Sequence, residues 1–205
     1  LGLLQADEGE ILIDGEDITA ATGTAHDAMM SRIGVLFQWA ALFDSLPVWE
    51  NVGFGLIAEK RMRRKDAREV AIEKMALVGL APDLADRSPA DLSGGMQKRA
   101  GLARAIATEP EIVLFDEPTT GLDPLMADVI NDLIADCVVD LGITALTITH
   151  DMRSAAAIAD RVAMLYEGQI TWSGPVDDLR DSGNPVMDQF IRGDVDGPIR
   201  ILGHS

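Results

Sequence analysis

The sequence contains few basic residues, one cysteine and no long apolar segment. Lys and Arg number 17 against 34 Asp and Glu, so the formal net charge is −17. Because surfaces that bind DNA or RNA normally carry a basic excess, this balance argues against nucleic acid as a partner. Cys137 has no second cysteine to pair with, which excludes an intrachain disulfide. No apolar run approaches the roughly 18 residues of a membrane span, so no membrane-spanning helix is predicted.

The remaining composition is that of a globular protein with a substantial core. The chain has 205 residues, of which 47% are hydrophobic and 25% charged, values typical of one domain. Cys137 falls within the helical pattern 125–141, where a reduced thiol packs as a small apolar group and indicates a reducing compartment. One basic cluster is either a solvated helix face or a contact for anionic lipid headgroups or an acidic partner: Lys60, Arg61, Arg63, Arg64, Lys65 and Arg68.

Short apolar runs alternate with amphipathic helical patterns, which predicts an α/β domain with a mostly parallel sheet. The expected strands are residues 10–14, 33–37, 112–116 and 144–149, followed by a hairpin of 161–166 and 169–173. The expected helices are residues 25–31, 47–58, 65–78, 96–108, 125–141, 151–159, 176–181 and 185–191. Residues 39–101 carry no strand pattern and predict a helical subdomain inserted into the core.

Two adjacent acidic residues, Asp116 and Glu117, end the buried strand 112–116. In an open α/β sheet, ligands bind beyond the carboxyl ends of the strands. Hydrolysis of a nucleoside triphosphate needs a cation held near the phosphates and a water molecule aimed in line at the terminal phosphorus. One carboxylate can hold the cation and the other can deprotonate the water, a general-base role worth roughly 10²–10⁴ in rate. The alternative is a pair of acids that merely ends a strand.

Ser93, Gly94 and Gly95 stand immediately before the helical pattern that starts at Met96. Backbone N–H groups at a helix N-terminus attract anions, and glycine lets the backbone approach a phosphate closely. The serine hydroxyl adds a donor. The pattern therefore predicts a phosphate contact, and an ordinary helix cap is the alternative.

Five motifs in a fixed order resemble those of the ATP-binding-cassette (ABC) ATPases. They are a Q-loop at Gln38, a signature at Leu92–Met96, a Walker B motif at Ile112–Glu117, a D-loop at Gly121–Asp123 and a switch histidine at His150. The resemblance implies a P-loop NTPase fold over residues 1–193, with the helical insert and remnants of an antiparallel β-subdomain. Residues 194–205 would form a C-terminal tail.

The resemblance also implies ATP and Mg²⁺ as cofactors and gives the motifs catalytic roles. Glu117 would be the general base and His150 would contact the γ-phosphate. Asp116 and Gln38 would hold Mg²⁺, and Gln38 would connect the phosphate site to the helical insert. An energy-coupling ATPase is thus the first hypothesis.

Two cassettes of this family bind ATP head to tail, which implies a homodimer. Asp116, in the Walker B motif, would serve the nucleotide of its own subunit, and Asp123 would also contact nucleotide. Ser93, Gly94 and Gly95 would instead face the nucleotide held by the partner. ATP would stabilise the closed pair and hydrolysis would release it.

Residues 37–54, FQWAALFDSLPVWENVGF, resemble the lipid-transport branch, which includes the Mla-type ATPases, their chloroplast relatives and those paired with Mce proteins. Met96 supports this, since that branch often has Met where most ABC proteins have Gln, as does the tail 196–198. The branch implies a transmembrane permease, accessory or Mce-type substrate-binding subunits, and a place on the cytoplasmic face of the inner membrane. Four apolar residues either line a permease groove or pack the insert: Trp39, Leu42, Phe43 and Trp49.

The phosphate loop of the family, Gly-x-x-Gly-x-Gly-Lys-Ser/Thr, does not occur in the 205 residues. Leu1–Leu4 resembles the end of the helix that follows the loop, so truncation at the N-terminus is expected. The chain as given should then bind ATP poorly, because the amides and the lysine that cradle phosphate are missing. Two alternatives stay open: a degenerate cassette that does not hydrolyse ATP, and a non-transport ABC ATPase acting on DNA or ribosomes. The short insert and the acidic balance argue against the second.

Overall fold

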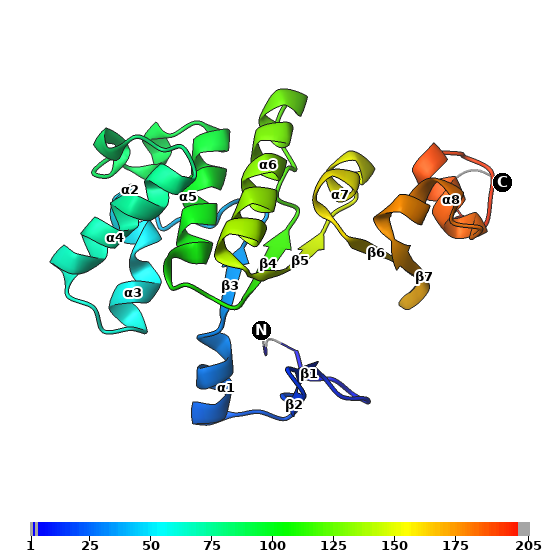
Figure 1. Ribbon diagram of the computed structural model, residues 1–205, viewed down its shortest axis with the longest axis horizontal. Helices are drawn as coiled ribbons and strands as arrows, with labels where there is room; N and C mark the ends of the chain where they lie inside the picture. The colour runs from blue at the N-terminus through cyan, green and yellow to red at the C-terminus, as the bar shows by residue number, and fades with distance from the viewer. Residues whose placement is uncertain (1, 3, 201–205) are drawn as a thin grey trace. The chain divides into compact units, whose positions relative to one another are not determined.

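The computed structural model describes residue 2 and residues 4–200. The chain divides into two compact units, Leu1–Ile148 and Thr149–Ser205, whose elements are named in Figure 1. Strands alternate with helices in the first unit, as predicted. The predicted boundaries of the domain and of its helical insert stay predictions.

Three parallel strands form the centre of the first unit. They are β3 (Ile33–Leu36), β4 (Ile112–Asp116) and β5 (Thr144–Ile148), and β4 is the middle strand. Leu36 lies opposite Phe115 and Asp116 lies opposite Ile148, so the strands end at a common edge. This confirms the parallel sheet and places the residues that follow these strands where α/β proteins bind ligands.

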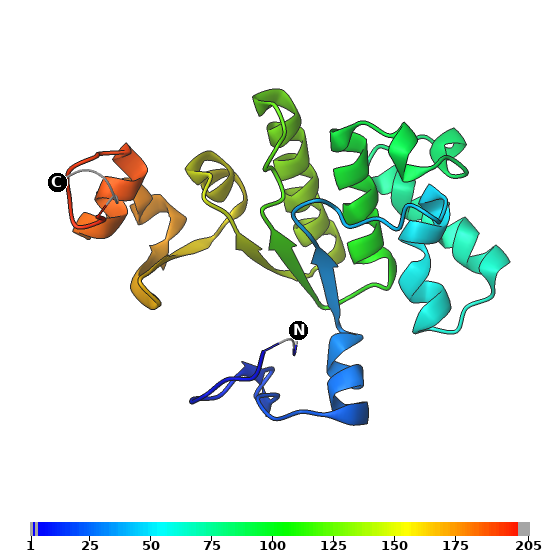
Figure 2. The ribbon, with the colours of Figure 1, turned by 180° about the vertical axis from the view of Figure 1, so that it is seen from behind.

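Helices α5 (Gly94–Ala107) and α6 (Pro124–Leu141) cover one face of this sheet, as the opposite views in Figures 1 and 2 show. Side chains alternate along β4, and Val113 and Phe115 are almost completely buried. On the other face, Ile112 and Leu114 line a cavity of about 600 Å³ together with residues that precede β3. The core includes Leu36, Leu102, Ile106, Ile130 and Ile134.

The segment between β3 and β4 is helical, as predicted. It contains α2 (Val48–Val52), α3 (Phe54–Ala58), α4 (Arg64–Leu77), the 3₁₀ turns η1 (Pro82–Leu84) and η2 (Pro89–Asp91), and α5. The single helix expected over 47–58 is wrong, because the chain breaks at Gly53. A Cβ there would lie 3.2 Å from the carbonyl oxygen of Trp49 and 3.3 Å from that of Ala67. Close packing against α4 therefore accompanies the break, a contact that periodicity does not reveal.

Asn51 on α2 organises the loop that follows β3. Its side chain is fully buried; Nδ2 donates to the carbonyl oxygens of Phe43, Leu46 and Pro47, and Oδ1 accepts from the N–H of Phe43 at 2.6 Å. Beside it, the rings of Phe43 and Phe54 pack with their centroids 4.8 Å apart. One amide side chain thus holds residues 43–47 against the helical insert.

Replacing Asn51 by Ala is expected to lower the free energy of unfolding by about 2–3 kcal/mol, because the backbone groups that it satisfies lose their partners. The measurement is denaturant unfolding. The control is Asp44→Ala in the same loop, where Asp44 is exposed; its effect should stay within about 0.5 kcal/mol. Equal effects of the two substitutions would contradict the assigned role of Asn51.

The N-terminal part of the first unit has the antiparallel pairing that was expected, but the bounds of its strands differ from the prediction. Instead of one strand over 10–14, two short antiparallel strands, β1 (Leu12–Ile13) and β2 (Glu16–Asp17), precede helix α1 (Gly23–Met30). The turn between the strands uses left-handed residues, Asp14 with φ 51° and Gly15 with φ 82°. The helix end expected at residues 1–4 is absent at residues 2 and 4, and residues 1 and 3 lie outside the described residues.

The second unit contains a hairpin and three helical segments. Strands β6 (Arg161–Tyr166) and β7 (Gln169–Pro175) form the predicted antiparallel hairpin. Helix α7 (Met152–Ile158) precedes the hairpin, and η3 (Val176–Asp181) and α8 (Pro185–Arg192) follow it. The tail docks on this unit. Gln189 donates to the carbonyl oxygens of Asp194 and Ile199 and accepts from the N–H of Ile199.

The basic cluster is partly neutralised by ion pairs. Arg63 pairs with Asp66 at 2.7 Å and Arg68 with Asp86 at 2.7 Å. Arg64 forms a two-pronged contact with Glu50 and lies 5.3 Å from the centroid of the Trp49 ring. Half of the cluster therefore has an intrachain carboxylate partner, which favours a solvated helix face over a lipid contact.

Candidate functional site

Asp116 and Glu117 lie at the carboxyl end of β4, in the middle of the sheet. Asp116 is exposed at this edge. Glu117 has a left-handed backbone, with φ 47°, a conformation that costs a residue other than Gly about 1–3 kcal/mol. Its N–H donates to the carbonyl oxygen of Ile148 at 2.9 Å, and its Oε2 accepts from the hydroxyl of Thr120 at 2.9 Å. Backbone and side chain of Glu117 are thus both anchored.

A buried lysine of α5 also contacts Glu117. The Nζ of Lys98 donates to the carbonyl oxygen of Glu117 at 3.0 Å, and only 4% of Lys98 is exposed. Burial lowers the pKa of Lys98, while the carboxylates of Glu117 and Asp116 act in the opposite direction. The candidate site therefore contains a cation that the motif pattern did not single out.

Gln38 follows β3 and is half-buried, one strand away from Asp116. The family resemblance implies that both hold Mg²⁺, and the parallel register of β3 and β4 brings the ends of their strands together. Just after Gln38, two alanines have left-handed backbones: Ala40 has φ 59° and Ala41 has φ 46°. The guanidinium of Arg104 donates to the carbonyl oxygens of Ala40 and Ala41 at 2.6 and 2.7 Å.

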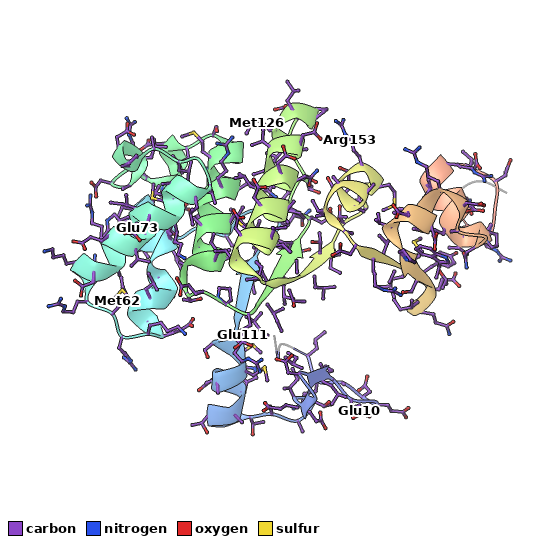
Figure 3. All side chains as sticks on the ribbon, viewed as in Figure 1. Glu10, Met62, Glu73, Glu111, Met126 and Arg153 are labelled. Carbon is purple, nitrogen blue, oxygen red and sulfur yellow. The ribbon has the colours of Figure 1, made fainter. Side chains whose placement is uncertain are left out.

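Ser93 is the N-cap of α5 and accepts a hydrogen bond from the N–H of Met96 at 3.3 Å. Ser93 and Gly94 are exposed, and a Cβ on Gly94 would meet nothing within 4 Å. A Cβ on Gly95 would lie 2.7 Å from the Cε of Met126, which Figure 3 marks on α6. Gly95 thus packs closely against the flexible end of Met126, whereas Gly94 has no intrachain reason to lack a side chain.

Asp123 caps α6, accepting from the N–H groups of Leu125 and Met126 at 3.0 and 3.1 Å. The predicted cap with Pro124 at the first helical position is confirmed. In the preceding D-loop, a Cβ on Gly121 would lie 3.5 Å from the ring of Trp39. The Q-loop and the D-loop therefore meet at Trp39, which is 71% exposed.

His150 belongs to the second unit and is exposed, so its role at the nucleotide stays a prediction. The neighbouring Asp151 caps α7 as predicted. Burial raises the pKa of Asp151, but hydrogen bonds from the Ser154 hydroxyl and the N–H groups of Arg153 and Ser154, with His150 nearby, outweigh burial and lower it overall.

Sequence patterns missed Lys98, Arg104 and Asn51. Arg104 lies between two alanines of an apolar stretch, which indicates a cation with a specific partner but not which one. Lys98 lies between Gln97 and Arg99, and Asn51 follows Glu50, so the sequence carries no such signal for these two. Among the described residues, no cluster of three or more His, Cys, Asp or Glu side chains forms a metal site. Within the same residues, no helix is long and apolar enough to cross a bilayer.

Known proteins share the sequence motifs and the fold of this chain. A model of the ABC transporter family matches residues 1–120. The chain belongs to the ABC transporter family. The matched residues include the Q-loop, the signature and the Walker B motif, and therefore Gln38, Asp116 and Glu117.

Three relatives of this ABC chain match 97% of its length. Identity is 42% with the chloroplastic protein TRIGALACTOSYLDIACYLGLYCEROL 3 of Arabidopsis thaliana. It is 39% with the probable ribonucleotide transport ATP-binding protein mkl of Mycobacterium bovis, and 36% with the intermembrane phospholipid transport system ATP-binding protein MlaF of Escherichia coli K12. The chain covers 62%, 55% and 73% of these proteins, respectively, so it spans little more than half of the first two.

A solved structure shares the fold of this ABC chain. The dimeric post-hydrolysis state of the ATP-binding cassette MJ0796, bound to ADP and Pi, superposes with a TM-score of 0.76 at 30% identity. The match covers 85% of this chain and 76% of that one. It confirms the predicted ABC ATPase fold class.

Proposed function

We propose that this chain is the ATP-hydrolysing cassette of a membrane ABC transporter that moves phospholipids. The observation that carries the ATPase assignment is the placement of Asp116 and Glu117 at the carboxyl end of the central strand, with hydrogen bonds at the N–H, the carbonyl oxygen and the carboxylate of Glu117. The assignment to lipids rests on the relative named for phospholipid transport, of which the chain covers 73%.

The residues at this edge fit ATP with Mg²⁺. Asp116 would supply a carboxylate oxygen and Gln38 an amide oxygen, and both are the hard oxygen ligands that Mg²⁺ prefers. When bound, Mg²⁺ neutralises charge on the phosphates. Glu117 accepts the proton of the attacking water, and its anchored backbone keeps the carboxylate oriented. His150 would contact the γ-phosphate, and Asp123 would be a further nucleotide-binding residue.

The working unit is a head-to-tail homodimer. Support comes from the exposed N-terminus of α5, where Ser93 and Gly94 face away from the rest of the chain's packing, and from the dimeric cassette MJ0796. Helix N-terminal amides and a glycine without a neighbour suit a phosphate that arrives from outside. Ser93, Gly94 and Gly95 would bind the nucleotide of the partner subunit.

A transmembrane permease is the second partner. Of the four apolar residues predicted either to line a groove or to pack the insert, Trp49 is buried, whereas Trp39 and Phe43 are exposed. The exposed rings of Phe43 and Phe54 pack together as one patch, and Phe37 and Trp39 are exposed on either side of Gln38 in the sequence. Such a patch fits a protein interface, and it would hold the cassette on the cytoplasmic face of the membrane, with Mce-type or other accessory subunits completing the complex.

Two other functions have less support. A DNA- or ribosome-associated ATPase would need a basic surface, whereas the net charge is −17 and three residues of the basic cluster are ion-paired. A cassette that binds without hydrolysing has no reason to anchor Glu117 on both sides.

The transport assignment is tested with the protein expressed from its complete coding sequence and reconstituted with its permease in phospholipid vesicles. Adding ATP and Mg²⁺ is expected to move fluorescent phospholipid between donor and acceptor vesicles, and omitting ATP should stop the transfer. A ribonucleotide enclosed in the same vesicles serves as the competing substrate, because one relative is named for ribonucleotide transport. ATP-driven movement of the nucleotide without lipid transfer would overturn the lipid assignment.

A further inference from the structure

Three residues with left-handed backbones at the candidate site share one feature. Ala40, Ala41 and Glu117 all have positive φ without being glycine, and the carbonyl oxygen of each accepts a hydrogen bond from a cation of α5. Hydrogen bonds from charged donors are stronger than those from neutral ones. The helix therefore holds two loops in conformations that their own residues disfavour.

Lys98 makes the first of these contacts. It lies near the N-terminus of α5 and is almost completely buried, with its Nζ 3.0 Å from the carbonyl oxygen of Glu117. The N–H of Thr120 also donates to this oxygen at 3.3 Å. Lys98 therefore contacts the backbone of the proposed general base rather than its carboxylate, so it acts through Glu117.

Arg104 makes the second contact, two turns further along α5. Its two terminal nitrogens hold the carbonyl oxygens of Ala40 and Ala41 at 2.6 and 2.7 Å. Gly101 lets the loop approach the helix, because a Cβ there would lie 2.8 Å from Leu36 and 3.1 Å from the Cβ of Ala40. A fork of two donors matches two successive carbonyls in a way that one ammonium group does not.

We propose that α5 couples the two nucleotide sites of the dimer, with Lys98 and Arg104 as positioning residues for Glu117 and for the Q-loop. The helix starts at Ser93, which by the proposed function faces the partner's nucleotide, so the inference rests on that function. The N-terminus of this helix meets the partner's nucleotide, and its side chains hold the general base Glu117 and the Q-loop of its own subunit. The helix therefore links the two nucleotide sites.

The test compares Lys98→Met, Arg104→Met and Arg104→Lys in the protein expressed from its complete coding sequence. Lys98→Met is expected to lower kcat for ATP by roughly 10- to 100-fold, as small misplacements of a catalytic group do, with KM changed less than about twofold. Arg104→Met should raise amide hydrogen exchange at residues 39–43, and Arg104→Lys should restore only part of the protection.

The control is Lys74→Met. Lys74 is a similarly buried lysine, 8% exposed, but it pairs with the carboxylate of Glu109 on the surface rather than with a catalytic loop. Lys98→Met should raise exchange at residues 117–120 and Lys74→Met should not. If Lys98→Met leaves both kcat and this exchange equal to those of Lys74→Met, the positioning role is overturned. A tenfold rise in KM at unchanged kcat overturns it as well.

Failure of the proposed function gives a different result. An inactive wild type, or a Glu117→Gln variant as fast as wild type, overturns the ATPase assignment. An active wild type with an inactive Glu117→Gln variant, combined with a Lys98→Met variant that matches Lys74→Met, overturns the coupling alone. Hydrogen exchange reports the hold of α5 on both loops without any need for turnover.

Discussion

Replacing Glu117 by Gln is expected to lower the rate of ATP hydrolysis by roughly 10²–10⁴ while ATP binding persists. The amide keeps the size of the side chain and can still pair with Thr120, but it does not accept a proton from water. The backbone contacts to Lys98 and Ile148 do not depend on the carboxylate. ATP should therefore trap the variant as a closed dimer, measured by size-exclusion chromatography together with phosphate release.

Glu111→Gln is the matched control. Glu111, labelled in Figure 3, immediately precedes β4 at the opposite end of the strand from Glu117. Its carboxylate pairs with Arg32. The same chemical change there removes a surface ion pair and should leave turnover within about twofold, since such pairs contribute little. Wild-type turnover in Glu117→Gln would remove Glu117 from the role of general base.

Replacing Gly94 by Asp should have opposite effects on stability and on activity. The first helical position of α5 is open, so the new side chain meets no atom of the chain. A carboxylate there favours the helix N-terminus, and the loss of Gly entropy adds to stability, so the thermal midpoint should stay the same or rise. The same carboxylate would repel the partner's γ-phosphate, and hydrolysis should fall by at least about 10²-fold.

Mixed dimers decide whether Gly94 acts on the partner's nucleotide. A Gly94→Asp subunit paired with a Glu117→Gln subunit keeps one site in which both halves are intact. A wild-type subunit paired with a subunit carrying both substitutions has one damaged half in each site. The first pairing should therefore hydrolyse ATP faster, measured as phosphate release by isolated heterodimers. A faster rate for the second pairing would show that Gly94 serves its own subunit's site, because the wild-type subunit would then keep one intact site.

Most elements of the fold could be predicted because their patterns are local. The strand 112–116 and the cap of α6 by Asp123 match the structure residue for residue, since a short apolar run and an Asp-Pro pair each carry their signal within a few positions. The break at Gly53 was not predicted, and for β1 and β2 only an antiparallel β-subdomain was expected, not which residues pair. Both depend on a neighbouring segment, α4 in one case and an antiparallel partner in the other.

In the candidate site, too, the local features could be predicted from the sequence and the long-range contacts could not. The motif order alone predicts the residues that would meet ATP, Mg²⁺ and the attacking water, because each occupies a defined place after a strand or before a helix. The contacts that hold those residues are not visible in the order of the chain. Lys98 and Glu117 are 19 residues apart, and Arg104 and Ala40 are 64 residues apart. These contacts exist because α5 packs against β3 and beside β4, and burial leaves each cation with backbone carbonyls as its partners. Local chemistry thus specifies which residues react, and long-range packing sets the backbone conformation in which they are held.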